Sequence, residues 1–313
     1  MGNRRKGRRQ GTARHAMDEP IAPKIVAALE AQLRRKVVQI TDVTAARQAA
    51  ARIQAASPGS DTLAGLHPVH AAYAVAQHHV AELSQAIVQL AEVQPLVELV
   101  ADAEDEYMPE GPPMSPLTAS YFACWSLFDA GVGAARETFG ICVAAIAGAA
   151  GLDHDQQRLI ANLQASRMGV YVHEGWAGEL LSLREVPTGA RCRAIVPAGY
   201  RGRPGQVWFT RVLPPPTPET AASLVLTTPY VLLHPGLDAW RAYFDRVLGG
   251  VPPEQRTAAC STHMKYGPAP RYWPEFIFEG YVNHEAGAIY LAGMPDDAKS
   301  RPHSWQYDGR YGR

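Results

Sequence analysis

The hydrophobic pattern changes its period near the middle of the chain. Between residues 23 and 40, and again between 68 and 90, apolar residues recur every three or four positions, which is typical of one helical face. Pro95 is expected to end or kink the second of these helices. From Met168 onward apolar residues alternate with other residues, which is typical of strands. The sequence therefore predicts helices in the first half of the chain and strands after it.

Breaks in the pattern divide the first half into five or six helices. The turn sequence at residues 57–61 separates an alanine-rich helix, about 41–56, from the helix that begins near Pro68. Ser115 before Pro116 predicts the start of an apolar helical segment, and Asp153 is a candidate cap for a helix that ends near Arg167. We expect a helical bundle over residues 20–167. Charged residues interrupt the apolar segment 117–151, which argues against a membrane span.

Closely spaced strands follow the helices. The alternation predicts strands at 168–173, 180–186, 191–197, 206–213 and 223–233, which favours a small antiparallel β barrel or meander over residues 168–235. A helix at 237–248, an ambiguous helix or strand from Pro274 and a strand at 288–291 then predict a mixed α/β C-terminal segment, 236–313. The predicted fold class is therefore α+β.

Three stretches of the strand region together resemble a known module. They are residues 179–190 (ELLSLREVPTGA), 205–214 (GQVWFTRVLP) and 228–233 (TPYVLL). This pattern is similar to a small β module of an uncharacterised bacterial protein family and covers about a fifth of the chain. The resemblance implies no activity, and it supports only the strand assignment.

Charge is distributed unevenly along the chain. Thirty basic residues balance thirty acidic ones, but six of the basic residues lie in the first sixteen positions, where there is no acid. Residues 1–19 are expected to form a disordered basic tail, which includes Arg4, Arg5, Lys6, Arg8 and Arg9. No apolar segment follows the tail, so it does not read as a signal peptide. The four cysteines have no paired spacing, which favours free thiols and a cytoplasmic location.

Arginines are the candidate ligand-binding residues of the strand region. Residues 168–233 hold six arginines and no lysine, and arginine binds phosphate with two parallel hydrogen bonds. Arg191 and Arg193 share the outer face of their strand, while Tyr200, Arg201 and Arg203 lie in a glycine-rich loop, 198–205. Aromatic and arginine side chains together are typical of surfaces that bind nucleic acid. We therefore expect a non-catalytic binding protein, with no cofactor, whose partner is nucleic acid or an acidic protein and not a membrane.

One arginine in this region is predicted to be buried. Arg211 shares a strand face with Val207, Phe209 and Leu213, and Glu185 shares one with two leucines. A buried arginine needs an acidic partner, so the sequence predicts an Arg211–Glu185 ion pair. The alternative is that Arg211 anchors a ligand.

An enzyme remains the alternative class of function. The chain has no GxSxG, HExxH or P-loop sequence. His173, Glu174 and Arg211 are the best polar groups for a pocket between the bundle and the β module, although adjacent residues of one strand face opposite ways. His78 and Glu82 are four residues apart, as metal ligands on a helix are, but no third ligand is visible and we expect no metal site.

Overall fold

The structure is a computed structural model that describes residues 20–36, 63–108, 116–285, 287–297 and 299. The basic tail and the helix expected at 41–56 lie outside the described residues. The chain forms two compact units. Described residues of the first are 20–36, 63–66, 74–102 and 130–164; those of the second are 67–73, 103–108, 116–129 and the described part of 165–299.

The first unit is helical. Its elements are α2 (Ile21–Lys36), most of α5 (Pro68–Ile87), the 3-10 helix η1 (Ala91–Val93), the start of α6 (Gln94–Tyr107), α8 (Phe139–Ile146) and α9 (His154–Ala165). The expected cap is confirmed, because Asp153 Oδ1 accepts a hydrogen bond from the amide of Gln156 at 2.8 Å. Pro95 lies in the first turn of α6, where its missing N–H costs no helical hydrogen bond. The buried carboxylate of Glu137 accepts hydrogen bonds from the amides of Ile21 and Ala22 at the start of α2.

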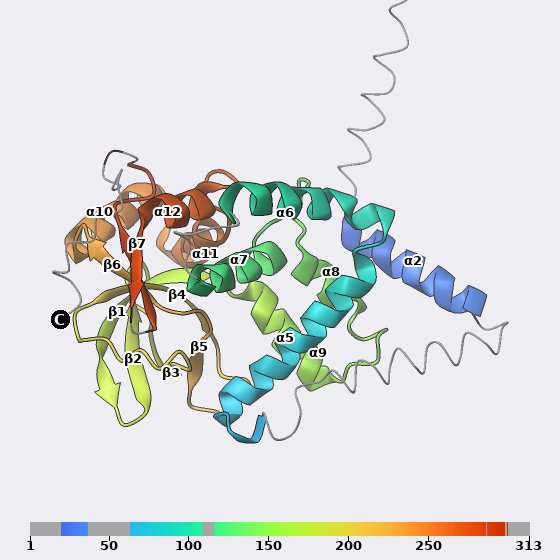
Figure 1. Ribbon diagram of the computed structural model, residues 1–313, viewed down its shortest axis with the longest axis horizontal. Coiled ribbons are helices and arrows are strands. Elements are labelled where there is room, and N and C mark those ends of the chain that lie inside the picture. Colours follow the sequence, from blue (N-terminus) through green and yellow to red (C-terminus); the bar gives the residue numbers. More distant parts are fainter. Residues whose placement is uncertain (1–19, 37–62, 109–115, 286, 298, 300–313) are drawn as a thin grey trace, which may run out of the picture. The chain divides into compact units, whose positions relative to one another are not determined.

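The second unit contains an eight-stranded sheet, whose strands can be followed in Figure 1. Its strands are β1 (Met168–Ala177), β2 (Leu180–Glu185), β3 (Arg191–Ile195), β4 (Val207–Leu213), β5 (Ser223–Val225), β6 (Tyr230–His234), β7 (Tyr281–Glu285) and β8 (Ala288–Ala292). Their order is β1-β2-β3-β5-β4-β6-β8-β7, and β1 also pairs with β4. This last pairing closes β1, β2, β3, β5 and β4 into a five-stranded barrel.

The α+β fold is thus present, but the sheet is mixed and not antiparallel throughout. β3 pairs with β5 in parallel, and so does β6 with β8. The segment expected to be one strand at 223–233 is two, because the chain leaves the sheet between β5 and β6. Thr227 in that break accepts a hydrogen bond from the Arg211 amide at 3.0 Å, and Pro229 has no amide hydrogen to give to a ladder.

Both faces of the sheet are buried around β4. Apolar side chains that fill the barrel are Tyr171, Leu181, Leu183, Ala194, Trp208 and Val225. Phe209 lies on the opposite face of β4 and stacks on Trp273, with 5.3 Å between ring centroids. Residues 207–211 are therefore all buried, although alternation along one strand normally hides one side only.

Helices of the second unit pack beside the sheet, and Trp273 and Phe276 contact Phe209 on the outer face of β4. These helices are α7 (Pro116–Phe128), α10 (Leu237–Leu248), α11 (Arg256–Tyr266) and α12 (Tyr272–Gly280), and the last three lie together in Figure 1. Trp240, Tyr243, Phe244 and Phe276 are buried among them. In the part of the chain that the structure describes, no helix has the length and apolar character needed to cross a membrane.

Candidate functional site

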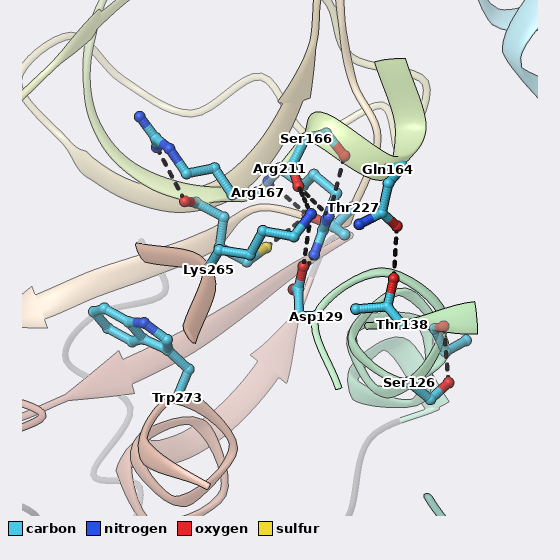
Figure 2. A network of polar contacts seen from close by, with 12 residues as sticks. Ser126, Asp129, Thr138, Gln164, Ser166, Arg167, Arg211, Thr227, Lys265 and Trp273 are labelled. Carbon is cyan, nitrogen blue, oxygen red and sulfur yellow. Dashed lines mark hydrogen bonds and ion pairs between the residues drawn. The ribbon is translucent and has the colours of Figure 1, made fainter. Parts of the chain in front are cut away.

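A cluster of buried charges lies between β4, α11 and the end of α7 (Figure 2). Arg211 is fully buried, which confirms that part of the sequence prediction. Its Nη2 contacts Asp129 Oδ2, and its Nη1 donates to the carbonyl and hydroxyl oxygens of Ser166 at 2.9 and 3.1 Å. A buried guanidinium needs acceptors for its donors, and among the described residues Nη1 and Nη2 have them while Nε has none.

Lys265 brings a second cation to the same cluster. Its Nζ donates to the Ser166 carbonyl oxygen at 3.1 Å and lies 3.7 Å from Asp129 Oδ1, and its side chain is 9% exposed. Burial lowers the pKa of Lys265 to about 8, Asp129 opposes this shift, and the nearby Arg211 adds to it. Burial also raises the pKa of Asp129, against the effect of the two cations. With all three groups ionised, the cluster carries a net charge of +1.

The predicted pair of Arg211 with Glu185 is wrong. β1 lies between their strands: Tyr171 is opposite both Glu185 and Trp208, so Glu185 points into the barrel with the tryptophan. Arg211 is three residues beyond Trp208 on β4 and therefore points to the outer face. Alternation of residues along a strand shows which side chains share a face. When both faces of the strand are buried, it does not show whether that face points into the barrel or away from it.

Glu185 has another arginine as its partner. Arg167 Nη1 lies 2.8 Å from Glu185 Oε1, and both side chains are largely buried. Thr188, in the turn after β2, also donates a hydrogen bond to the Glu185 carboxylate. The Arg167–Glu185 pair connects the residue before β1 with the end of β2. The Arg211–Asp129 pair connects β4 with the residue that follows α7.

The outer surface of β2 and β3 carries three arginines. Arg184 is directly opposite Arg191, and Arg193 is two residues along β3 from Arg191. Glu174 of β1 lies between the first two, with its carboxylate 2.7 Å from Arg184 Nε and 3.0 Å from Arg191 Nε. Arg193 is exposed. We call Arg184, Arg191 and Arg193 the basic face.

The loop 198–205, here called the arginine loop, is anchored to one end of the barrel. The carbonyl oxygen of Arg201 accepts hydrogen bonds from Trp176 Nε1 at 2.6 Å and from His173 Nε2 at 2.9 Å. The Arg201 guanidinium lies over the Trp176 ring, 4.3 Å from its centroid, which is a cation–π contact. The loop therefore presents Arg201 and the exposed Arg203 from a fixed backbone.

Tyr200 fixes the inner side of the arginine loop. Its half-buried ring packs against Trp208, with centroids 5.5 Å apart, and its hydroxyl is 3.3 Å from Gln206 Oε1. The same Gln206 oxygen accepts hydrogen bonds from the Arg203 amide and from Trp208 Nε1, each at 3.1 Å. Part of the Tyr200 ring is thus already used for packing on Trp208. Gln206 contacts Tyr200, Arg203 and Trp208, and the sequence alone did not indicate this role.

Replacing Gly202 by alanine is expected to displace the arginine loop. Gly202 has φ 58°, and a Cβ there would lie 2.5 Å from Cζ2 of the buried Trp208. Gly199 has φ 75° and open space around its Cβ position, so Gly199→Ala is a matched control for the backbone cost of about 1–2 kcal/mol. Urea unfolding followed by tryptophan fluorescence should show a larger loss for Gly202→Ala than for Gly199→Ala. Equal losses would contradict the packing of the loop on Trp208.

The three residues considered for catalysis are not brought together. His173 is fully buried in the barrel, where its Nε2 donates to Arg201 and its Nδ1 accepts from the Gly175 amide at 3.1 Å. Glu174 lies on the basic face. Arg211 is opposite Met168, five residues along β1 from His173, which is about 17 Å in an extended strand. Among the described residues no three His, Cys, Asp or Glu side chains are grouped to hold a metal ion.

Asp129 and Lys265 are the residues of the buried cluster that sequence reasoning missed. Asp129 had a signal, because it is one of only two acids, with Glu137, in the apolar segment 117–151. Lys265 lies in a polar stretch of α11 and had none. Searches for related proteins give no further guide: no protein-family model, curated protein or solved structure matches the chain.

Proposed function

We propose that this protein binds nucleic acid, in single-stranded form, through the basic face and the arginine loop. The observation that carries the proposal is the arrangement of Arg201: its guanidinium is stacked on Trp176 while its own backbone is held by two hydrogen bonds. A guanidinium placed over an aromatic ring offers a surface on which a nucleotide base can stack, and the exposed arginines beside it suit phosphates.

Charge supports the same proposal. Arg193, Arg201 and Arg203 are exposed, and among the described residues none of them forms an ion pair. By contrast, Arg241, Arg246 and Arg256 on α10 and α11 each have an acidic partner. Arg4, Arg5, Lys6, Arg8 and Arg9 lie outside the described residues. We propose that they add sequence-independent, salt-dependent affinity, because each phosphate contact releases counterions.

Arg201→Ala and Arg203→Ala are expected to weaken binding of a short single-stranded oligouridylate. Each lost phosphate contact should flatten the plot of log affinity against log salt concentration by roughly 0.7. Arg241→Ala, which removes an exposed arginine of α10, is the matched control and should leave the slope unchanged. Fluorescence anisotropy at several salt concentrations measures this. If all three variants bind alike, neither loop arginine contacts the nucleic acid.

Two further arms of that experiment test the kind of ligand. Removing residues 2–14 should also flatten the slope while leaving thermal stability unchanged. Tyr200→Ala should cost about 1–3 kcal/mol of affinity for single strands and much less for duplex, whose bases are already stacked. Tyr200→Phe keeps the ring and controls for loss of the hydroxyl contact with Gln206. Binding of an acidic peptide in place of the oligonucleotide would identify the partner as a protein and overturn this proposal.

A further inference from the structure

Two guanidinium groups of the basic face converge on one carboxylate. Arg184 Nε is 2.7 Å from Glu174 Oε1, and Arg191 approaches the same carboxylate with Nε at 3.0 Å from Oε2 and Nη2 at 3.4 Å from Oε1. Arg191 thus uses two of its nitrogens on one partner. This side-on geometry matches carboxylate and phosphate equally well, because both present two oxygens in one plane to the guanidinium.

The two arginines would repel one another without an anion between them. They are directly opposite on adjacent antiparallel strands, where like charges destabilise the pair. Two positive charges and one carboxylate leave a net charge of +1 at this point of the surface. The neighbouring Arg193 is exposed to solvent and adds a further positive charge. The site therefore attracts an anion with more charge than a single carboxylate.

We propose that Arg184 and Arg191 form a phosphate-binding subsite that Glu174 fills while no ligand is bound. On this view, Glu174 competes with the phosphates of the polyanion and weakens its binding. The inference rests on the proposed function in one respect only, namely that the phosphate belongs to a nucleic acid. Binding of a phosphate group by the two arginines does not depend on that function.

Glu174 lies at a point where the strand is irregular. β1 has a bulge between His173 and Gly175, and Gly175 has φ 118°, which favours glycine. The Glu174 side chain is 25% exposed and that of Arg191 is 71% exposed, so water can replace either partner. Exposed ion pairs of this kind are weak, and the carboxylate can swing away while the arginines stay on their strands. The two arginine hydrogen bonds lower the pKa of Glu174, so it is ionised at neutral pH.

The test compares two substitutions with the same change in charge. Glu179 is exposed in the turn between β1 and β2, a few residues from Glu174. Glu174→Gln should tighten binding of a fluorescein-labelled oligouridylate about two- to fivefold more than Glu179→Gln does, since only the first releases the arginines. Arg184→Ala should abolish this difference between the two glutamine variants. Equal tightening by both would overturn the competition by Glu174.

A second measurement separates the subsite from the proposed function. Inorganic phosphate is titrated into the wild-type protein while NMR follows the Nε–H signals of Arg184 and Arg191, with Arg241 as the internal control. The subsite requires that the two signals move together and saturate while that of Arg241 does not. If they move but no oligonucleotide binds to any variant, the subsite stands and nucleic-acid binding is wrong. If they do not move, the subsite is wrong even where the oligonucleotide binds.

Discussion

Arg211→Ala should lower the free energy of unfolding by about 3–5 kcal/mol, among the largest losses expected from any single substitution in this chain. The substitution leaves the carboxylate of Asp129 buried with Lys265 as its remaining charged partner, and it opens a cavity beside Phe128 and Met168. A buried carboxylate that loses its nearest cation costs more than the lost ion pair itself. Urea unfolding at neutral pH measures the loss.

Two further variants show whether the pairing with Asp129 causes this loss. Arg193→Ala removes an exposed arginine of the same sheet and should change stability by less than about 0.5 kcal/mol. Asp129→Asn should also destabilise, and the double variant should lose less than the sum of the two single losses. Additive losses would mean that Arg211 and Asp129 do not interact, contrary to the contact in Figure 2.

Wild-type protein should gain stability between neutral and mildly alkaline pH relative to Lys265→Met. The pKa of Lys265 is lowered from 10.5 to about 8 in the folded state, because burial disfavours the ammonium ion. Below about pH 8 both the folded and the unfolded chain bind this proton, so the penalty is constant. Between the two pKa values the unfolded chain binds more protons, and the free energy of unfolding therefore rises with pH.

The expected gain is about 2 kcal/mol between pH 7 and about pH 9.5, from 1.36 kcal/mol per pKa unit. Urea unfolding of both proteins at each pH gives this difference, and groups that the two share cancel in it. The gain levels off as the pH approaches 10.5, the pKa of Lys265 in the unfolded chain, because above it neither state binds the proton. A difference that stays constant over the range would mean that Lys265 titrates normally.

Local features of this fold followed from the sequence. The β2 and β4 boundaries, helix α10 and the cap at Asp153 agree with alternation, helical period and capping chemistry, all of which depend on neighbouring residues. The burial of Arg211 also followed, because its apolar neighbours at positions 209 and 213 share its strand face. These are properties of one element at a time.

Pairings between elements that are far apart in the sequence could not be predicted from it. The parallel ladders β3–β5 and β6–β8 depend on where the chain crosses, and no local pattern specifies that. The partner of Arg211 was misassigned for the same reason, since Asp129 belongs to the end of a helix and not to a neighbouring strand. At the candidate interface, the sequence indicated exposed arginines but not the Glu174 carboxylate between two of them, because the bulge that places it depends on tertiary pairing.

The second unit is built from segments that are separated in the sequence, and this affects how it folds during synthesis on the ribosome. Asp129 and Arg211 are 82 residues apart, and Lys265 follows Ser166 by 99. At roughly 5–20 residues per second, several seconds pass between translation of Asp129 and translation of Arg211. The first unit, whose last residue is Gln164, has been translated completely by then, whereas α7 has no charged partner for its adjoining carboxylate. We therefore expect the first unit to fold during translation, and the buried cluster of the second unit to form only after Arg211 and Lys265 have emerged.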